Sequence, residues 1–225
     1  MEPESGTVVL LGAGALDDPS TSQQLAELAS GPVVVLPTAA AFTGMETAVV
    51  EVTGRFVELG LEVEGVMAAS RADAQNEELV KRLDTAALVW LADGNSLHLK
   101  TTLRDTLLLD ALWGVLARGG VVAASGSVAS ALCDPMIDPR GGAPMIGLGL
   151  VTSVCVVAGD EAASGHDEMR NRTLGLVSPT MPVAVLAPGT GLTLSSQGPS
   201  SIGGMPDVYV GGRPVADGLS AIGSF

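Results

Sequence analysis

The sequence is poor in cysteine, lysine and aromatic residues. Two cysteines among 225 residues are too few for a disulfide framework or a structural zinc site, and this count predicts a protein of the reducing cytoplasm. Lysine occurs only at Lys81 and Lys100, and 11 Lys and Arg residues face 25 Asp and Glu residues, for a net charge of −14. No stretch can neutralise a row of phosphates, so nucleic acid is not an expected partner.

Long unbroken apolar runs and complete cofactor motifs are lacking as well. The uncharged stretches 141–159 and 173–206 are long enough to span a membrane, but glycines and prolines interrupt both, so we expect no membrane partner. The N-terminal segment is acidic where a secretory signal would be basic, which argues against export. Neither a cluster of metal ligands nor a full dinucleotide fingerprint after Gly12-Ala13-Gly14 is present, so we expect no metal and no cofactor.

What the chain does contain is enough apolar sequence for one core. At 47% hydrophobic residues and a mean hydropathy of +0.42, residues 1–225 are expected to form a single domain. Short β-branched runs alternate with helical patterns in the first half. The expected strands are 7–11, 32–36, 61–66, 86–91 and 120–124, and the expected helices are 20–29, 45–60, 74–83 and 105–117.

This alternation predicts an α/β fold with three layers, in which a mostly parallel sheet has helices on both faces. After about residue 140 the pattern changes to short runs separated by Gly and Pro, at 153–158, 182–187, 190–195 and 206–215. We expect these runs to add antiparallel edge strands to the same sheet. The functional site should lie at the carboxyl ends of the parallel strands.

Two stretches at such strand ends could carry chemistry. Asp93-Gly94-Asn95-Ser96 follows one strand and opens a helix, so its residues are expected to cap that helix, to bind substrate, or both. The segment 119–136, GGVVAASGSVASALCDPM, reads as a strand, a turn of small residues and a helix. Such an elbow can present a nucleophile, and Ser125, Ser127 and Ser130 are all available in it.

The run DGNSLHLKTTLRDTLLLDALWGVLARGGVVAASGSVASALCDPMIDPRGGAPMIGLGL resembles the central segment of the cyanophycinase and peptidase E (dipeptidase E) serine peptidases. The resemblance extends over most of the chain and is strongest over residues 93–150. It implies the class I glutamine-amidotransferase-like fold and a serine that attacks peptide or β-aspartyl bonds with a histidine as base. It also implies a homodimer and a small, peptide-like ligand.

The family's Gly-x-Ser-Ala-Gly-Ala motif is degenerate in this chain. Counting from Gly119-Gly120 and from Asp134-Pro135-Met136 gives one register, and in it Gly126 stands at the nucleophile position. Ser127 and Val128 take the places of the following alanine and glycine. Because a β-branched valine fits poorly where glycine's positive φ is used, we expect the turn to be relaxed.

The resemblance also assigns residues around the nucleophile. His166 is the candidate base and Asp138 a candidate for orienting it, while His98 and the two cysteines are expected to be structural. The implied substrate-binding residues are Gly94, Asn95, Ser96, Gly126 and Arg172. An additional carboxylate at Asp93, where the family has glycine, should disfavour acidic substrates.

Two functions from different classes follow. In the first, the chain is a pseudoenzyme that has lost serine-peptidase activity and keeps a pocket for a small ligand or partner, because no nucleophile stands at residue 126. In the second, it is an active hydrolase of peptide or isopeptide bonds that uses Ser127 and His166, with backbone N–H groups near Ser127 holding the oxyanion.

Overall fold

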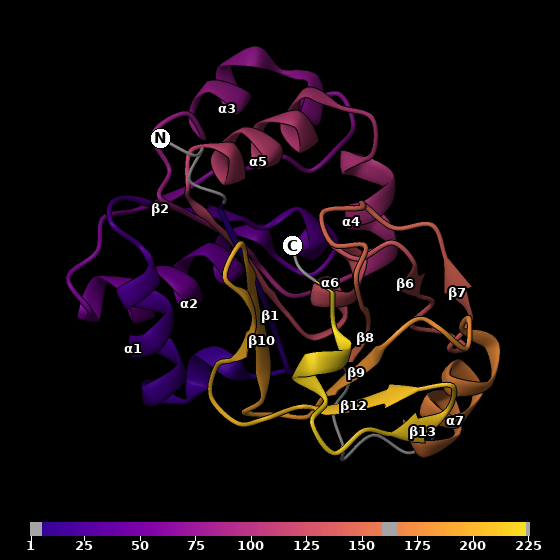
Figure 1. The fold of residues 1–225 in the computed structure, drawn as a ribbon. Helices are drawn as coiled ribbons and strands as arrows, with labels where there is room; N and C mark the ends of the chain where they lie inside the picture. Colours follow the sequence, from indigo (N-terminus) through magenta and orange to yellow (C-terminus); the bar gives the residue numbers. More distant parts are fainter. Residues whose placement is uncertain (1–5, 159–165, 224–225) are drawn as a thin grey trace.

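The computed structural model describes residues 6–158 and 166–223, and its first half alternates strands and helices as the sequence predicts (Figure 1). The strands coincide with the β-branched runs, and all but the partly exposed edge strand at 63–65 are buried on both faces of the sheet. The elements up to residue 131 are β1 (Thr7–Leu11), α1 (Pro19–Leu28), β2 (Val33–Leu36), α2 (Met45–Glu58), β3 (Val63–Gly65), α3 (Glu77–Lys81), β4 (Leu88–Leu91), α4 (Ser96–Leu103), α5 (Leu107–Ala117), β5 (Val121–Ser125) and α6 (Gly126–Ala131).

The central sheet has seven strands in the order β11-β10-β1-β5-β4-β2-β3. Strands β1 to β5 are mutually parallel, whereas β10 (Gly191–Ser195) and β11 (Gly198–Ser201) run antiparallel at one edge. This arrangement confirms the predicted α/β class with a mostly parallel sheet and antiparallel C-terminal edge strands. Strands β4 and β5 are neighbours, so the segments that follow them meet at one edge of the sheet.

The other C-terminal strands differ from the expectation, because they leave the central sheet. A second sheet has the order β13-β12-β9-β8, and a two-stranded sheet pairs β6 (Met136–Ile137) with β7 (Pro144–Met145). Strands β8 (Cys155–Ala158) and β9 (Val183–Leu186) are parallel, since α7 (His166–Leu176) lies between them in sequence. Strands β12 (Asp207–Val210) and β13 (Arg213–Pro214) form the expected hairpin.

Each face of the central sheet has its own core. Successive strand residues point to opposite faces. Accordingly Val9 and Leu11 pack in the cluster that contains residues of α1 and α2, whereas Val8 and Leu10 pack in the larger cluster with residues of α4, α5 and α6. The strand residues of both clusters are almost completely buried. The sheet is therefore held rigidly between two helical layers, and its carboxyl edge is a stable platform.

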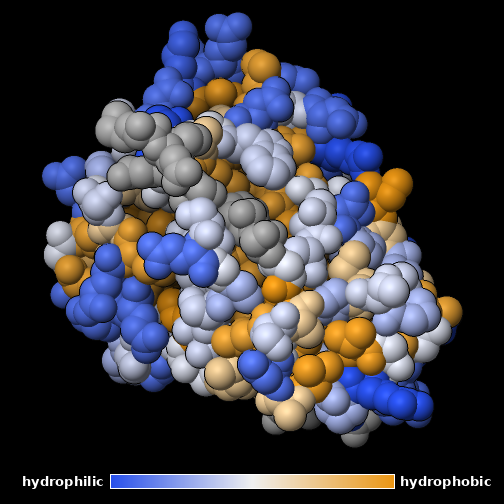
Figure 2. Space-filling model, in the orientation of Figure 1, coloured by the Kyte–Doolittle hydropathy of each residue, from blue (hydrophilic) through white to orange (hydrophobic). Residues whose placement is uncertain are grey.

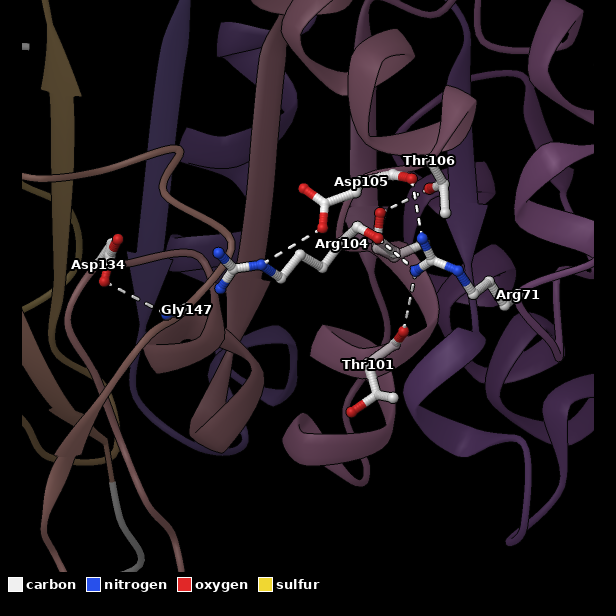
Figure 3. A network of polar contacts seen from close by, with 8 residues as sticks. Arg71, Thr101, Arg104, Asp105, Thr106, Asp134 and Gly147 are labelled. Carbon is white, nitrogen blue, oxygen red and sulfur yellow. Dashed lines mark hydrogen bonds and ion pairs between the residues drawn. The ribbon is translucent and has the colours of Figure 1, made fainter.

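Helix α4, which begins shortly after strand β4, is fixed at its C-terminal end by the side chain of Arg71 (Figure 3). The guanidinium of Arg71 donates to the carbonyl oxygens of Thr101, Arg104 and Asp105, the last at 3.0 Å. Asp105 has a φ of +55°, which turns the chain sharply out of the helix. A cation at a helix C-terminus satisfies carbonyl groups that lack partners within the helix.

The surface carries both hydrophilic and hydrophobic residues. In Figure 2, hydrophilic side chains gather along the top and left edges of the visible face, and hydrophobic residues are frequent in its lower part, where β12, β13 and α7 lie in Figure 1. Within residues 6–158 and 166–223, no helix has the length and apolar character needed to cross a membrane.

Candidate functional site

The segment after β4 is a sharp turn that leads directly into α4. Gly94 has a φ of +151°, and a Cβ at this position would collide with the backbone of Ala39, so only glycine fits there. Asn95 caps the helix: its Oδ1 accepts from the His98 N–H at 3.0 Å, and its own N–H donates to the Ala39 carbonyl at 2.8 Å. Ser96 is buried, and its hydroxyl has no hydrogen-bond partner among the described residues.

The segment after β5 keeps the strand-turn-helix geometry of a nucleophile elbow. Gly126, the first residue of α6, has a φ of +57° directly after the strand ends at Ser125. The expectation of a relaxed turn is therefore wrong. Val128 causes no conflict, because it lies inside the short helix with its side chain fully buried in the larger core cluster and needs no positive φ.

The carboxylate of Asp93 stands directly beside Gly126. A Cβ built on Gly126 would lie 2.7 Å from Oδ2 and 3.0 Å from Oδ1 of Asp93. The Gly94 N–H donates to Oδ1 at 2.9 Å and holds the carboxylate in place. Burial raises the pKa of Asp93 above its ordinary value, and the hydrogen bond from Gly94 opposes this shift only in part.

Ser127 lies next to this pair, but its hydroxyl is already engaged. Its Oγ donates to the carbonyl oxygen of Gly94 at 3.2 Å, which ties α6 to the turn after β4. On its other side Ser127 lines a small cavity of about 110 Å³, together with Ser130 and with Met169 of α7. Ser130 has a structural partner, because its buried Oγ accepts from the Ile137 N–H at 3.0 Å.

The structure does not bring the other candidate residues, Asp138 and Arg172, into contact with the elbow, and it does not describe the side chain of His166. His166 is the first residue of α7, and its side chain lies outside the described residues. Arg140 donates to the carboxylate of Asp138 from Nε at 2.9 Å and from Nη2 at 2.8 Å, and these bonds lower the pKa of Asp138 to about 2. Arg172 is exposed on α7, with Nη1 4.0 Å from a Cβ built on Gly141. In the described part of the chain, no hydrogen bond or ion pair joins Asp138 or Arg172 to Gly126 or Ser127.

The structure confirms structural roles for His98 and for both cysteines. The Nε2 atom of His98 lies 2.9 Å from the Ala69 carbonyl oxygen, and its ring packs edge-on against Phe42. Cys133 and Cys155 are buried, and burial raises the pKa of both thiols, that of Cys155 to about 12. Neither thiol is activated as a nucleophile.

A larger cleft of about 680 Å³ opens on the other side of Asp93, against α2. Asp93 and Ser125 line it from the ends of β4 and β5, and Glu51 and Arg55 belong to its α2 wall. Sequence reasoning missed these two α2 residues, because a helix pattern identifies the buried face but not which polar positions border a cleft. Among the described residues, no group of three His, Cys, Asp or Glu side chains is placed to hold a metal ion.

Comparisons with known proteins agree with this geometry. No curated protein sequence matches the chain. Two solved structures share its fold: a peptidase from an acI-B1 actinobacterium, at 19% identity and a TM-score of 0.73 over 94% of this chain and 96% of that one, and a putative peptidase E protein from Listeria monocytogenes EGD-e, at 13% identity and a TM-score of 0.65 over 88% and 98%. The model of peptidase family S51 matches residues 8–146, more than half of the sequence. The chain therefore belongs to peptidase family S51.

Proposed function

We propose that this member of peptidase family S51 does not act as a serine peptidase and instead binds a small ligand in the cleft beside Asp93. The observation that carries the proposal is the contact between Asp93 and Gly126. A glycine occupies the elbow at a positive φ, and a carboxylate fills the volume into which a side chain at residue 126 would project. Covalent catalysis from this position has no nucleophile to start it.

The residues at positions 93 and 126 both differ from those that the family resemblance implies, and the two differences fit each other sterically. The family resemblance implies glycine where Asp93 stands and serine where Gly126 stands. A Cβ at residue 126 would lie 2.7 Å from Asp93 Oδ2, so the Asp93 side chain would have to shift to make room for it. The two departures therefore support one another structurally, as expected for a site that has adopted a different use.

Other features of the site are those of a binding pocket. The turn formed by Gly94, Asn95 and Ser96 is held firmly against Ala39, and the adjoining cleft of about 680 Å³ is within the size range of small-molecule sites. The scaffold around the elbow is intact, so binding does not depend on the missing nucleophile.

A second candidate, an active serine hydrolase that uses Ser127 and His166, is favoured by one specific observation. Ser127 lines the 110 Å³ cavity together with Met169, and α7 begins at His166, one helical turn before Met169. Against this candidate stands the hydrogen bond from the Ser127 hydroxyl to the Gly94 carbonyl, since that bond directs the proton of Oγ away from a base.

Labelling with an activated fluorophosphonate distinguishes the two candidates. We expect the folded wild-type protein to form no adduct by intact mass, under conditions in which a serine peptidase added as a reagent control is fully labelled. Circular dichroism of the same sample establishes that the fold is intact. A stoichiometric adduct mapped to Ser127 and lost in Ser127→Ala would overturn the proposal and establish the serine hydrolase.

We further propose that the protein forms a homodimer. Large hydrophobic side chains remain exposed on this chain, among them Phe42, Val50, Ile146 and Met205, which supports self-association. Sedimentation equilibrium at micromolar concentration tests this proposal, and a single species with the mass of the 22.6 kDa chain would contradict it.

A further inference from the structure

The 680 Å³ cleft beside Asp93 has a strongly acidic lining. Asp17, Glu51, Glu58 and Asp93 border it, against a single cation, Arg55. Arg55 is already paired, because its Nη2 lies 3.1 Å from Oδ1 of Asp17. Among the described residues, the other three carboxylates have no ion-pair partner. The potential in the cleft therefore attracts cations and repels anions.

Among these carboxylates, Asp93 stands in the turn after β4, directly beside Gly126. Its only hydrogen-bond partner in the described part of the chain is the Gly94 N–H, at 2.9 Å, and that bond uses only Oδ1. Oδ2 faces Gly126 and is left without a donor. A carboxylate that no cation neutralises gains a charge-assisted hydrogen bond from a cation that arrives with a ligand.

A second, independent observation comes from Ser125. Its side chain is 5% exposed and lies on the same face of β5 as Val121 and Ala123, which is the face that packs toward α1 and α2. Ser125 lines the cleft, yet its hydroxyl caps no helix and has no hydrogen-bond partner among the described residues. Ser125 is almost completely buried as a residue, yet its unpaired hydroxyl is open to the cleft, so it is available to a polar group of a ligand.

The wall between these polar groups is apolar. Trp90, which is 2% exposed, and Ala92 line the cleft from β4 and the turn that follows it. Trp90 is held edge-on against Phe56 with ring centroids 6.3 Å apart, so this wall is rigid. A ligand that fits needs an apolar body in addition to its charged group.

We propose that the cleft binds a primary ammonium group on a short aliphatic chain, with Asp93 as its counter-ion and the Ser125 hydroxyl as a further hydrogen-bond acceptor. This inference rests on the proposed binding function and names its ligand class. It assigns a binding role to Ser125 and to the α2 side of Asp93, away from Ser127. Anionic ligands of the same length are excluded by the three unpaired carboxylates.

The test follows the fluorescence of Trp90 during titration with n-hexylammonium. Trp113, which is 43% exposed on α5, is first replaced in a Trp113→Phe background so that Trp90 is the only reporter. Hexanoate and hexan-1-ol, which have the same chain length, serve as matched probes. We expect saturable binding of n-hexylammonium, confirmed by calorimetry, and no saturation with hexanoate or hexan-1-ol at the same concentrations.

Variants then locate the site. Asp93→Asn keeps the shape of the side chain and should weaken n-hexylammonium binding at least tenfold, and Ser125→Ala should weaken it severalfold. Asp84→Asn, which removes an exposed carboxylate outside the cleft, should leave it unchanged. The inference is overturned if n-hexylammonium does not saturate, if hexanoate binds equally well, or if Asp93→Asn binds like the parent protein. Its failure is distinct from that of the proposed function, which is read from a covalent adduct at Ser127.

Discussion

Asp93 Oδ2 lies 2.7 Å from the point where a Cβ on Gly126 would stand. The two residues come from the ends of neighbouring parallel strands, β4 and β5, so their proximity is a property of the sheet and not of a flexible loop. Residue 126 keeps the positive φ of an elbow, while residue 93 supplies the functional group that projects there. At this edge of the sheet the carboxylate of Asp93 lies where a side chain on residue 126 would project.

Gly126→Ala should destabilise the fold by about 2 kcal/mol, because alanine is strained at positive φ and its Cβ would collide with Asp93. Urea unfolding of Gly126→Ala, Asp93→Ala and the double variant measures this effect as a double-mutant cycle. We expect the double variant to recover about 1 kcal/mol relative to the sum of the single changes. Strict additivity would mean that the two residues do not compete for space.

Ionisation of Asp93 should lower the free energy of unfolding at neutral pH. Its pKa is raised in the folded state, so the folded protein holds this proton more tightly than the unfolded chain. The free energy of unfolding therefore loses a contribution as the pH rises from the ordinary pKa of 3.8 through the higher folded value. Asp93→Asn should show a smaller decrease over that interval when chemical denaturation is measured at successive pH values, and an identical profile would contradict the shift.

Asp138 should behave in the opposite way. Its hydrogen bonds with Arg140 lower its pKa from 3.8 to about 2, so the ionised form is favoured by folding. Its stabilising contribution is fully present above the ordinary pKa and is lost as the pH falls toward about 2. In thermal unfolding, Asp138→Asn should lower the midpoint at pH 7 and have little effect near pH 2. Arg140→Gln is the partner variant and should reproduce this dependence.

Removing the side chain of Arg71 should loosen the C-terminal end of α4. Arg71→Ala leaves the carbonyl oxygens of Thr101, Arg104 and Asp105 to water and should cost about 1 kcal/mol of unfolding free energy (Figure 3). Hydrogen exchange should rise in α4 and stay unchanged in α2. Arg82→Ala removes another exposed guanidinium, paired with Glu64, and should not affect exchange in α4.

The thiols of Cys133 and Cys155 should not react with alkylating reagents in the folded protein. Cys133 and Cys155 are buried with raised pKa values, so almost no thiolate is present at pH 8. Iodoacetamide should modify neither residue on the time scale that fully alkylates a denatured sample, as read by peptide mass mapping. Rapid modification of Cys133 alone would contradict its placement in the core.

Two features could be predicted from the sequence: the parallel strands, and the position of the turns after β4 and β5 at one edge of the sheet. The runs at 7–11, 32–36, 86–91 and 120–124 consist of apolar residues, most of them β-branched or alanine, and such runs have few alternatives to buried parallel strands. Once they are strands, Gly94, Asn95 and Ser96 must meet Gly126 and Ser127, because the carboxyl ends of neighbouring parallel strands share one edge.

Other features depend on tertiary contacts that no local pattern encodes. The short strands β8, β9, β12 and β13 could join either sheet equally well by sequence, and the connection through α7 makes β8 and β9 a parallel pair. The bulk of Val128 suggested a relaxed turn, but the positive φ is needed at Gly126, and the core accepts the Val128 side chain two residues later. Asp138 and Arg140 are only two residues apart, yet their pairing depends on the turn that they occupy, which no sequence pattern specifies.

The steric exclusion between residues 93 and 126 also restricts how this chain can change. A serine introduced at residue 126 alone would be pushed against the Asp93 carboxylate, and a glycine introduced at residue 93 alone would leave the elbow empty. A serine at residue 126 therefore needs either a rotated Asp93 side chain or a smaller residue at position 93. The 2.7 Å separation thus couples the two positions, because any side chain at residue 126 requires the Asp93 carboxylate to move.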